Sequence, residues 1–185
     1  RHNGEALLQE CIAEVQRLET TLTEFDQESE TSLINRSAGI QPVQVSLETY
    51  QLIERSIHIS ELTGGAFDIT SGILKKLYNF KGQEFTFLST SLIQQTLKQT
   101  GYNKIQLTPP HTVYLPVQGM HIGFGAIGKG YAADRVKNLL RSKGVESGVI
   151  NASGDLPAWG MRANGQPWKT GIAAPDDPAK IIVWL

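Results

Sequence analysis

The sequence has one cysteine, Cys11, and no apolar run long enough to cross a lipid bilayer. A single cysteine excludes an internal disulfide. It lies at helical spacing with leucine, isoleucine and valine residues between positions 7 and 22, which predicts a buried thiol. Neither sign of charge predominates, because 17 Lys and Arg stand against 18 Asp and Glu. The whole chain therefore predicts no polyanionic partner such as nucleic acid.

Signatures of several site classes are also missing. The four histidines share no spacing with cysteine or acidic residues, so no zinc site is predicted. There is no Gly-x-Ser-x-Gly segment, which argues against the nucleophile turn of an α/β-hydrolase. The 185 residues, 40% of them hydrophobic, are enough for one domain with a core or for two small lobes. Because the sequence starts at Arg1 and stops within the strand-like run 181–185, we expect a fragment truncated at both ends.

Hydrophobic periodicity and turn residues predict a mixed order of helices and strands. Ser46 is a candidate N-cap, and Gly64-Gly65 a candidate helix end. The acidic stretch 24–30 is expected to be a solvated loop. Expected helices cover 5–24, 47–63, 89–100 and 129–143; expected strands cover 104–107, 112–115, 119–123, 149–152, 169–173 and 181–185. The order does not alternate strictly, which favours the α+β class.

A glycine-rich turn carries the strongest functional signal. Within Ile122–Asp134, four glycines surround Lys129 directly before a helical pattern; they are Gly123, Gly125, Gly128 and Gly130. Glycines let backbone amides approach an anion, and a helix N-terminus and a lysine both add positive charge. The turn therefore predicts a phosphate cradle, although close packing of a strand against a helix explains the glycines equally well. It is neither a P-loop, because Tyr131 follows Lys129-Gly130, nor a dinucleotide fingerprint.

Two further segments are candidates for a site. Asp68 stands beside Phe67 after a helix end, where its carboxylate can accept hydrogen bonds from a ring amide or a ribose. An Asx turn is the alternative for Asp68. Asn151–Asp155 places short polar side chains after a strand, which suits either a site wall or a plain turn. Asn164–Trp168 reads as a hairpin turn with a packed tryptophan.

These motifs, in this order and spacing, resemble the ApbE family, the FAD:protein FMN transferases. The matching segments are Ser29–Asn35, Gly65–Thr70, Phe124–Asp134 and Asn151–Asp155, extended by Gly165–Trp168 and Gly171–Pro175. The resemblance implies one FAD-binding domain over residues 1–185, with an ApbE-like, T-fold-related sheet flanked by helices and an FAD cleft between lobes. It also implies magnesium-dependent transfer of FMN from FAD to a threonine or serine hydroxyl of a target flavoprotein. Some members of the family instead hydrolyse FAD to FMN and AMP.

The resemblance assigns site residues by position. The implied FAD contacts are Phe25, Ala66, Phe67, Asp68, Gly123 and Lys129. Lys129 would lie at the phosphates, and the backbone carbonyl of Ala126 would bind Mg²⁺. Gly123 departs from the family pattern, which commonly has an acidic residue there. No catalytic residue is assigned, and the remaining metal ligands would lie downstream of Leu185.

Partners and location are implied in the same way. The resemblance implies an acceptor flavoprotein such as a redox-complex subunit, no nucleic acid, and a place in the periplasm or cell envelope. The full-length protein would be an inner-membrane lipoprotein whose lipid anchor is not in this chain. Three other functions remain open: a non-catalytic FAD-binding protein of the same family, an FAD pyrophosphatase of the same family, and an interaction domain in which Lys129 only packs a turn.

Overall fold

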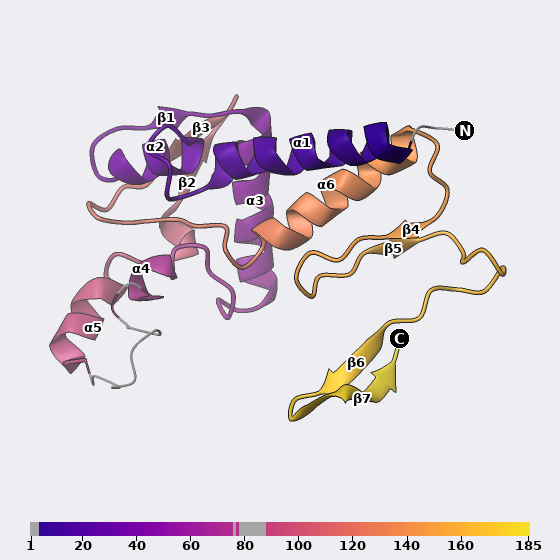
Figure 1. The fold of residues 1–185 in the computed structure, drawn as a ribbon. Coiled ribbons are helices and arrows are strands. Elements are labelled where there is room, and N and C mark those ends of the chain that lie inside the picture. The colour runs from indigo at the N-terminus through magenta and orange to yellow at the C-terminus, as the bar shows by residue number, and fades with distance from the viewer. Residues whose placement is uncertain (1–3, 76, 78–87) are drawn as a thin grey trace. The chain divides into compact units, whose positions relative to one another are not determined.

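The computed structural model describes residues 4–75, 77 and 88–185 (Figure 1). The chain divides into two compact units. The central unit is Arg17–Ile127, and the terminal unit combines Arg1–Gln16 with Gly128–Leu185. Helix α1 (Gly4–Leu22) begins in the terminal unit and ends in the central unit. Helices and small antiparallel sheets occur in both units, so the chain is α+β, as the sequence predicts.

The central unit contains most of the helices and one three-stranded antiparallel sheet of order β1-β3-β2. Its strands are β1 (Val43–Gln44), β2 (Gln106–Thr108) and β3 (Thr112–Tyr114). Its helices after α1 are α2 (Glu30–Arg36), α3 (Leu47–Leu62), α4 (Gly72–Lys75) and α5 (Thr90–Leu97), with a 3₁₀ turn at Tyr102–Lys104. The predicted hairpin around Pro109-Pro110 is confirmed, with Leu107 opposite Val113.

The predicted signals for the start and the end of α3 are confirmed. Ser46 caps α3 by accepting a hydrogen bond from the Thr49 amide at 3.2 Å. Gly64 and Gly65 follow α3 with positive φ, the conformation that ends many helices. Apolar side chains from α3, β3 and the segment after it form the buried core, and these include Leu52, Ile53, Val113, Leu115, Met120 and Ile122.

The acidic stretch is more ordered than a solvated loop. Helix α2 begins inside it at Glu30, and the buried Ser29 caps this helix through the Ser32 amide. The Glu30 carboxylate accepts hydrogen bonds from both the amide and the hydroxyl of Ser46, each at 2.8 Å. Glu30 therefore fixes the start of α3, while Asp26 stays exposed, as expected of the loop.

The expected strand at 119–123 is wrong, for a specific reason. Met120, Ile122 and Phe124 are buried alternately, which is the pattern of a strand. Among residues 4–75, 77 and 88–185, the backbone of this segment pairs with no strand. Instead the Asn35 side chain bonds both backbone groups of Ile122, and the Gly123 amide donates to the Ile69 carbonyl at 3.0 Å. The alternation of apolar residues in the sequence indicates which side chains are buried, but it does not indicate which groups bond the backbone of the segment.

In the terminal unit the N-terminal half of α1 runs antiparallel to α6 (Gly128–Ser142) (Figure 1). Glu14 pairs with Arg135 at 3.3 Å and Glu10 with Lys143 at 2.6 Å. Cys11 on this part of α1 is half-buried, so its thiol is less buried than the sequence predicts. Several apolar neighbours at helical spacing are also exposed: Leu8, Ile12 and Val15.

The rest of the terminal unit consists of two antiparallel hairpins. The strands are β4 (Gly148–Val149), β5 (Ala158–Trp159), β6 (Gly171–Ala174) and β7 (Asp177–Trp184). The predicted turn at 164–168 is present, and the Trp168 indole donates to the Trp159 carbonyl at 3.0 Å. In β6–β7, Ile172 lies opposite Val183.

Candidate functional site

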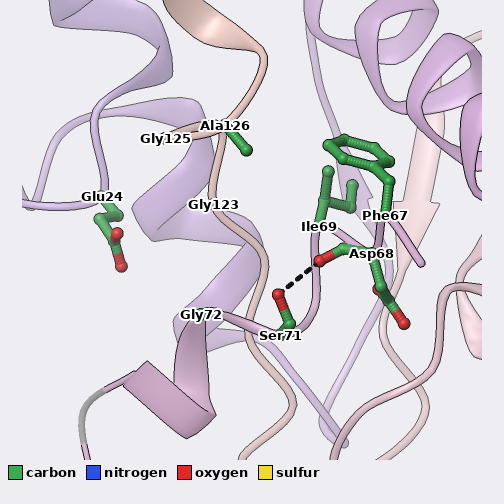
Figure 2. A pocket seen from close by; sticks show the side chains of 9 residues that line it. All are labelled: Glu24, Phe67, Asp68, Ile69, Ser71, Gly72, Gly123, Gly125 and Ala126. Atoms are coloured by element: carbon green, nitrogen blue, oxygen red, sulfur yellow. Dashed lines mark hydrogen bonds between the residues drawn. The ribbon is translucent and has the colours of Figure 1, made fainter. Parts of the chain in front are cut away.

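The central unit has a cavity of about 270 Å³. Three segments that are far apart in the sequence form its wall: the start of the α1–α2 loop, the loop from α3 into α4, and the segment before α6. The lining residues are Glu24, Phe67, Asp68, Ile69, Ser71, Gly72, Gly123, Gly125 and Ala126 (Figure 2).

Asp68 fixes the shape of the loop after α3. One carboxylate oxygen accepts hydrogen bonds from the amide and the hydroxyl of Thr70, at 2.8 and 2.7 Å. The other accepts from the amide of Tyr102 at 3.0 Å. The hydroxyl of the fully buried Thr70 in turn accepts from the Gly101 amide at 2.7 Å. Asp68 thus makes an Asx turn and ties its loop to the residues after α5.

Hydrogen bonds from Asn35 in α2 and from the Asp68 loop hold the segment before α6 in place. The Asn35 amide group accepts from the Ile122 amide at 2.8 Å and donates to the Ile122 carbonyl at 2.9 Å. The next amide, that of Gly123, donates to Ile69 in the Asp68 loop. A short turn follows, in which the Ile127 amide donates to the Phe124 carbonyl at 3.1 Å. Two cavity walls are therefore joined directly by a main-chain hydrogen bond.

A carboxylate–imidazole pair stands at the edge of the cavity. The His121 Nε2 atom lies 2.5 Å from Glu24 Oε2, and both side chains are mostly buried. The Asn35 amide nitrogen lies 3.4 Å from the same imidazole nitrogen. The sequence gives no signal for this pair, because the partners are 97 residues apart and no local motif connects them.

The structure brings together four of the residues that the sequence assigned to a site. Phe67, Asp68, Gly123 and Ala126 line the same cavity. The exposed Ala66 precedes Phe67 in the chain but does not line the cavity.

The other two assigned residues lie elsewhere. Phe25 is 88% exposed, and it does not line the cavity either. Lys129 belongs to the terminal unit, where it is exposed on the first turn of α6.

The terminal unit brings two of the sequence motifs together. The Asn151–Asp155 segment forms a tight turn, in which Ala152 pairs with Asp155 and Ser153 has a φ of +56°. A side chain added at Gly130 would meet the Asp155 carboxylate at 3.9 Å. This polar turn therefore lies against the first turn of α6, next in sequence to Lys129.

The described residues contain no cluster of three or more His, Cys, Asp or Glu side chains that would suit a metal ion. In the same part of the chain, no helix has both the length and the apolar character needed to cross a membrane.

The model of the ApbE family matches residues 2–185. The chain belongs to the ApbE family. Among curated ApbE relatives, one from Klebsiella pneumoniae (strain 342) is 32% identical over 182 residues, which cover 98% of this chain and 56% of the relative. One from Treponema pallidum is 29% identical over 184 residues, which cover 92% and 51%. Both relatives are named FAD:protein FMN transferase.

Solved ApbE structures have the same fold. An ApbE protein from Thermotoga maritima superposes with a TM-score of 0.87 at 30% identity, over 98% of this chain and 59% of that one. The apo form of the flavinyl transferase ApbE from Pseudomonas stutzeri gives 0.84 at 26% identity, over 93% and 55%. The chain spans about half the length of the curated relatives that it matches.

Proposed function

We propose that the protein is an FAD:protein FMN transferase, which moves FMN from FAD to a threonine or serine hydroxyl of a target flavoprotein. The observation that carries the proposal is membership of the ApbE family over nearly the whole chain, with the family's fold preserved at 30% identity. The cavity adds local support, because four residues assigned from the sequence line it together.

The binding roles follow from the chemistry of these residues. Phe67 offers an aromatic face to a planar ring of FAD. The turn before α6 offers main-chain amides, and the N-terminus of this 15-residue helix favours a negatively charged group. Lys129 supplies a full positive charge at the same point of the sequence, and we propose that it binds the pyrophosphate. For Phe25 and Ala66 the proposed FAD contact rests on the family resemblance alone.

In the proposed reaction the acceptor oxygen attacks the phosphorus of the FMN half. The bond from this phosphorus to the bridging oxygen breaks, AMP leaves, and the hydroxyl proton passes to a base or to water. Negative charge accumulates on the phosphoryl oxygens, so fixed positive groups and aimed amides lower the barrier. Lys129 and the amides of the turn would stabilise this charge.

We include Mg²⁺ in the proposed reaction on the family resemblance alone. The Ala126 carbonyl is the proposed ligand from this chain, and it lies at the cavity wall. Mg²⁺ requires near-octahedral oxygen coordination, and one carbonyl provides a single position. The described residues supply no acidic cluster to complete the set, so no step of the reaction is derived through the metal.

The test combines the full-length protein with FAD, Mg²⁺ and a candidate acceptor flavoprotein. The expected result is a covalent mass gain of one FMN on the acceptor, with release of AMP, and no gain when the acceptor hydroxyl residue is replaced by alanine. AMP release without an adduct would instead identify an FAD pyrophosphatase. Tight FAD binding without either product would identify a non-catalytic FAD-binding protein, and absence of FAD binding would refute the proposal.

We extend the proposal to organisation and location on the same resemblance. Residues 1–185 would form one FAD-binding domain, and the acceptor would be a subunit of a redox complex in the periplasm or cell envelope. Fractionation of the host cell, followed by detection of the full-length protein, would test the location.

A further inference from the structure

We propose that Glu24 is a ligand-contacting residue of the cavity, whose carboxylate accepts a hydrogen bond from an N–H or O–H group of the bound nucleotide. The inference rests on the proposed binding of FAD, and it adds a residue that neither the sequence motifs nor the family match assigns. From the sequence, the acidic stretch that contains Glu24 was expected to be a solvated loop, and it predicted no such role.

Gly123 leaves space for Glu24 at the cavity wall. A side chain built at this glycine would point at Glu24, with its Cβ 3.3 Å from Oε1 and 3.6 Å from the carboxyl carbon. The absence of a side chain at position 123 therefore leaves room for the Glu24 carboxylate beside the main chain of the cavity wall. Glu24 itself is one of the lining residues.

The Glu24 carboxylate is held in place by its neighbours. His121 contacts Glu24 Oε2 at 2.5 Å, and His121 directly precedes Ile122, whose two main-chain groups are fixed by Asn35. A preoriented acceptor loses less conformational entropy when a ligand binds than a mobile surface glutamate does.

The two carboxylates of the cavity have different roles. Both oxygens of Asp68 accept hydrogen bonds from the protein's own loops, so Asp68 shapes the wall. Glu24 is oriented by the imidazole of His121. In the view of Figure 2, the segment that carries Gly123 lies between Glu24 on one side and Phe67 and Asp68 on the other. A ligand that lies across Gly123 would reach Phe67 with an apolar ring and Glu24 with a donor group.

Both halves of FAD carry suitable donors. The flavin half has a ring imide and ribityl hydroxyls, and the adenosine half has an amino group and ribose hydroxyls. In either half, the group that contacts the Glu24 carboxylate would be an uncharged N–H or O–H donor. FMN and ADP, used as separate probes, distinguish the two sources.

The experiment measures FAD, FMN and ADP affinities of the full-length protein by calorimetry, for the wild type, Glu24→Gln and Glu24→Ala. Loss of a charged acceptor is expected to weaken FAD binding about tenfold or more in Glu24→Ala, and less in Glu24→Gln. Glu28→Gln is the matched control, because it changes an exposed carboxylate of the same loop and should leave the affinity unchanged. Thermal melts identify a temperature at which every variant is folded.

A second variant keeps the inference testable if truncation of Glu24 also affects stability. Gly123 does not have a positive φ, so an L residue is compatible with its backbone. Gly123→Asp in the Glu24→Ala background returns a carboxylate to the same space, and is expected to recover much of the lost affinity. In the wild-type background the same change places two carboxylates together and should weaken binding, a coupling that a double-mutant cycle measures.

The outcomes separate the two proposals. If the wild type binds FAD and Glu24→Ala binds equally well, the inference is overturned while the proposed function stands. If the wild type does not bind FAD, both are overturned. A loss with Glu24→Ala, shared with FMN or with ADP and recovered by Gly123→Asp, supports the inference and identifies the half of FAD that Glu24 contacts.

Discussion

At the scale of single residues, Asp68 shows how one side chain can serve both the fold and a site. Its carboxylate accepts three hydrogen bonds, from Thr70 and from the main chain of Tyr102. The same residue lines the cavity. The sequence left an Asx turn and a ligand contact open as alternatives. The turn is present in the structure, and the contact with FAD remains a proposal.

We therefore predict that Asp68→Ala lowers the stability of the protein. The change leaves the Thr70 and Tyr102 amides without their acceptor, which costs about 1–3 kcal/mol in the free energy of unfolding. Urea unfolding measures the loss. The control is Asp26→Ala, because Asp26 makes a similar turn with the Glu28 amide at an exposed position. Equal stabilities of the two variants would contradict the structural role of Asp68.

Cys11 gives a prediction about pH. Burial raises the pKa of its thiol above the usual value, and the charge of Glu10 raises it further. The unfolded chain therefore loses its thiol proton first as the pH rises. The contribution of Cys11 to stability is full below the unfolded pKa, and it is lost as the pH rises through the folded pKa.

The measurable consequence is slow alkylation of Cys11. Only the thiolate reacts, so the rate of reaction with iodoacetamide should rise with pH around a midpoint above that of an unfolded peptide. Glu10→Gln removes the second cause and should shift the midpoint downward. A midpoint in the folded protein at or below that of the peptide would contradict the prediction.

At the scale of elements, the sequence predicted best where local signals decide. Ser46 and Gly64-Gly65 mark the ends of α3 because capping depends on neighbouring residues. The segment 119–123 was expected to be a strand, and in the structure its side chains are indeed buried alternately. Its backbone instead bonds the Asn35 side chain and the Ile69 carbonyl. Both residues are far away in the sequence, so the local alternation of apolar residues cannot reveal them. The Glu24–His121 pair was not predicted either, because its two residues are also far apart in the sequence.

The segment before α6 supplies the third prediction. Asn35→Ala should cost about 2–3 kcal/mol in the free energy of unfolding, because both main-chain groups of the fully buried Ile122 lose their partner. Urea unfolding measures this, and hydrogen exchange at the Ile122 amide should become faster. Asn103→Ala, at an exposed position, is the control. Unchanged exchange at Ile122 would show that Asn35 does not hold this segment.

At the scale of the whole molecule, the site residues assigned from the sequence are divided between the two compact units. Phe67, Asp68, Gly123 and Ala126 belong to the central unit, and Lys129 belongs to the terminal unit. Short-range patterns located these residues individually. Their grouping depends on contacts within each unit, such as the bond from Gly123 to Ile69, which are not visible in the sequence. A test of the proposed binding must therefore report on the protein as a whole.

Ligand-dependent stability provides such a report. A ligand that binds only the folded protein stabilises it by about 2.7 kcal/mol at 100 times its Kd, so FAD should raise the melting temperature in a concentration-dependent way. Lys129 is exposed, and we expect Lys129→Ala to melt like the wild type without ligand. With ligand, the variant should need about tenfold more FAD for the same rise, because a charged contact with phosphate is lost. Lys169→Ala removes another exposed cation of the terminal unit and should follow the wild-type curve. If Lys129→Ala also follows that curve, Lys129 does not bind the pyrophosphate, and the glycines around it only allow the chain to turn into α6.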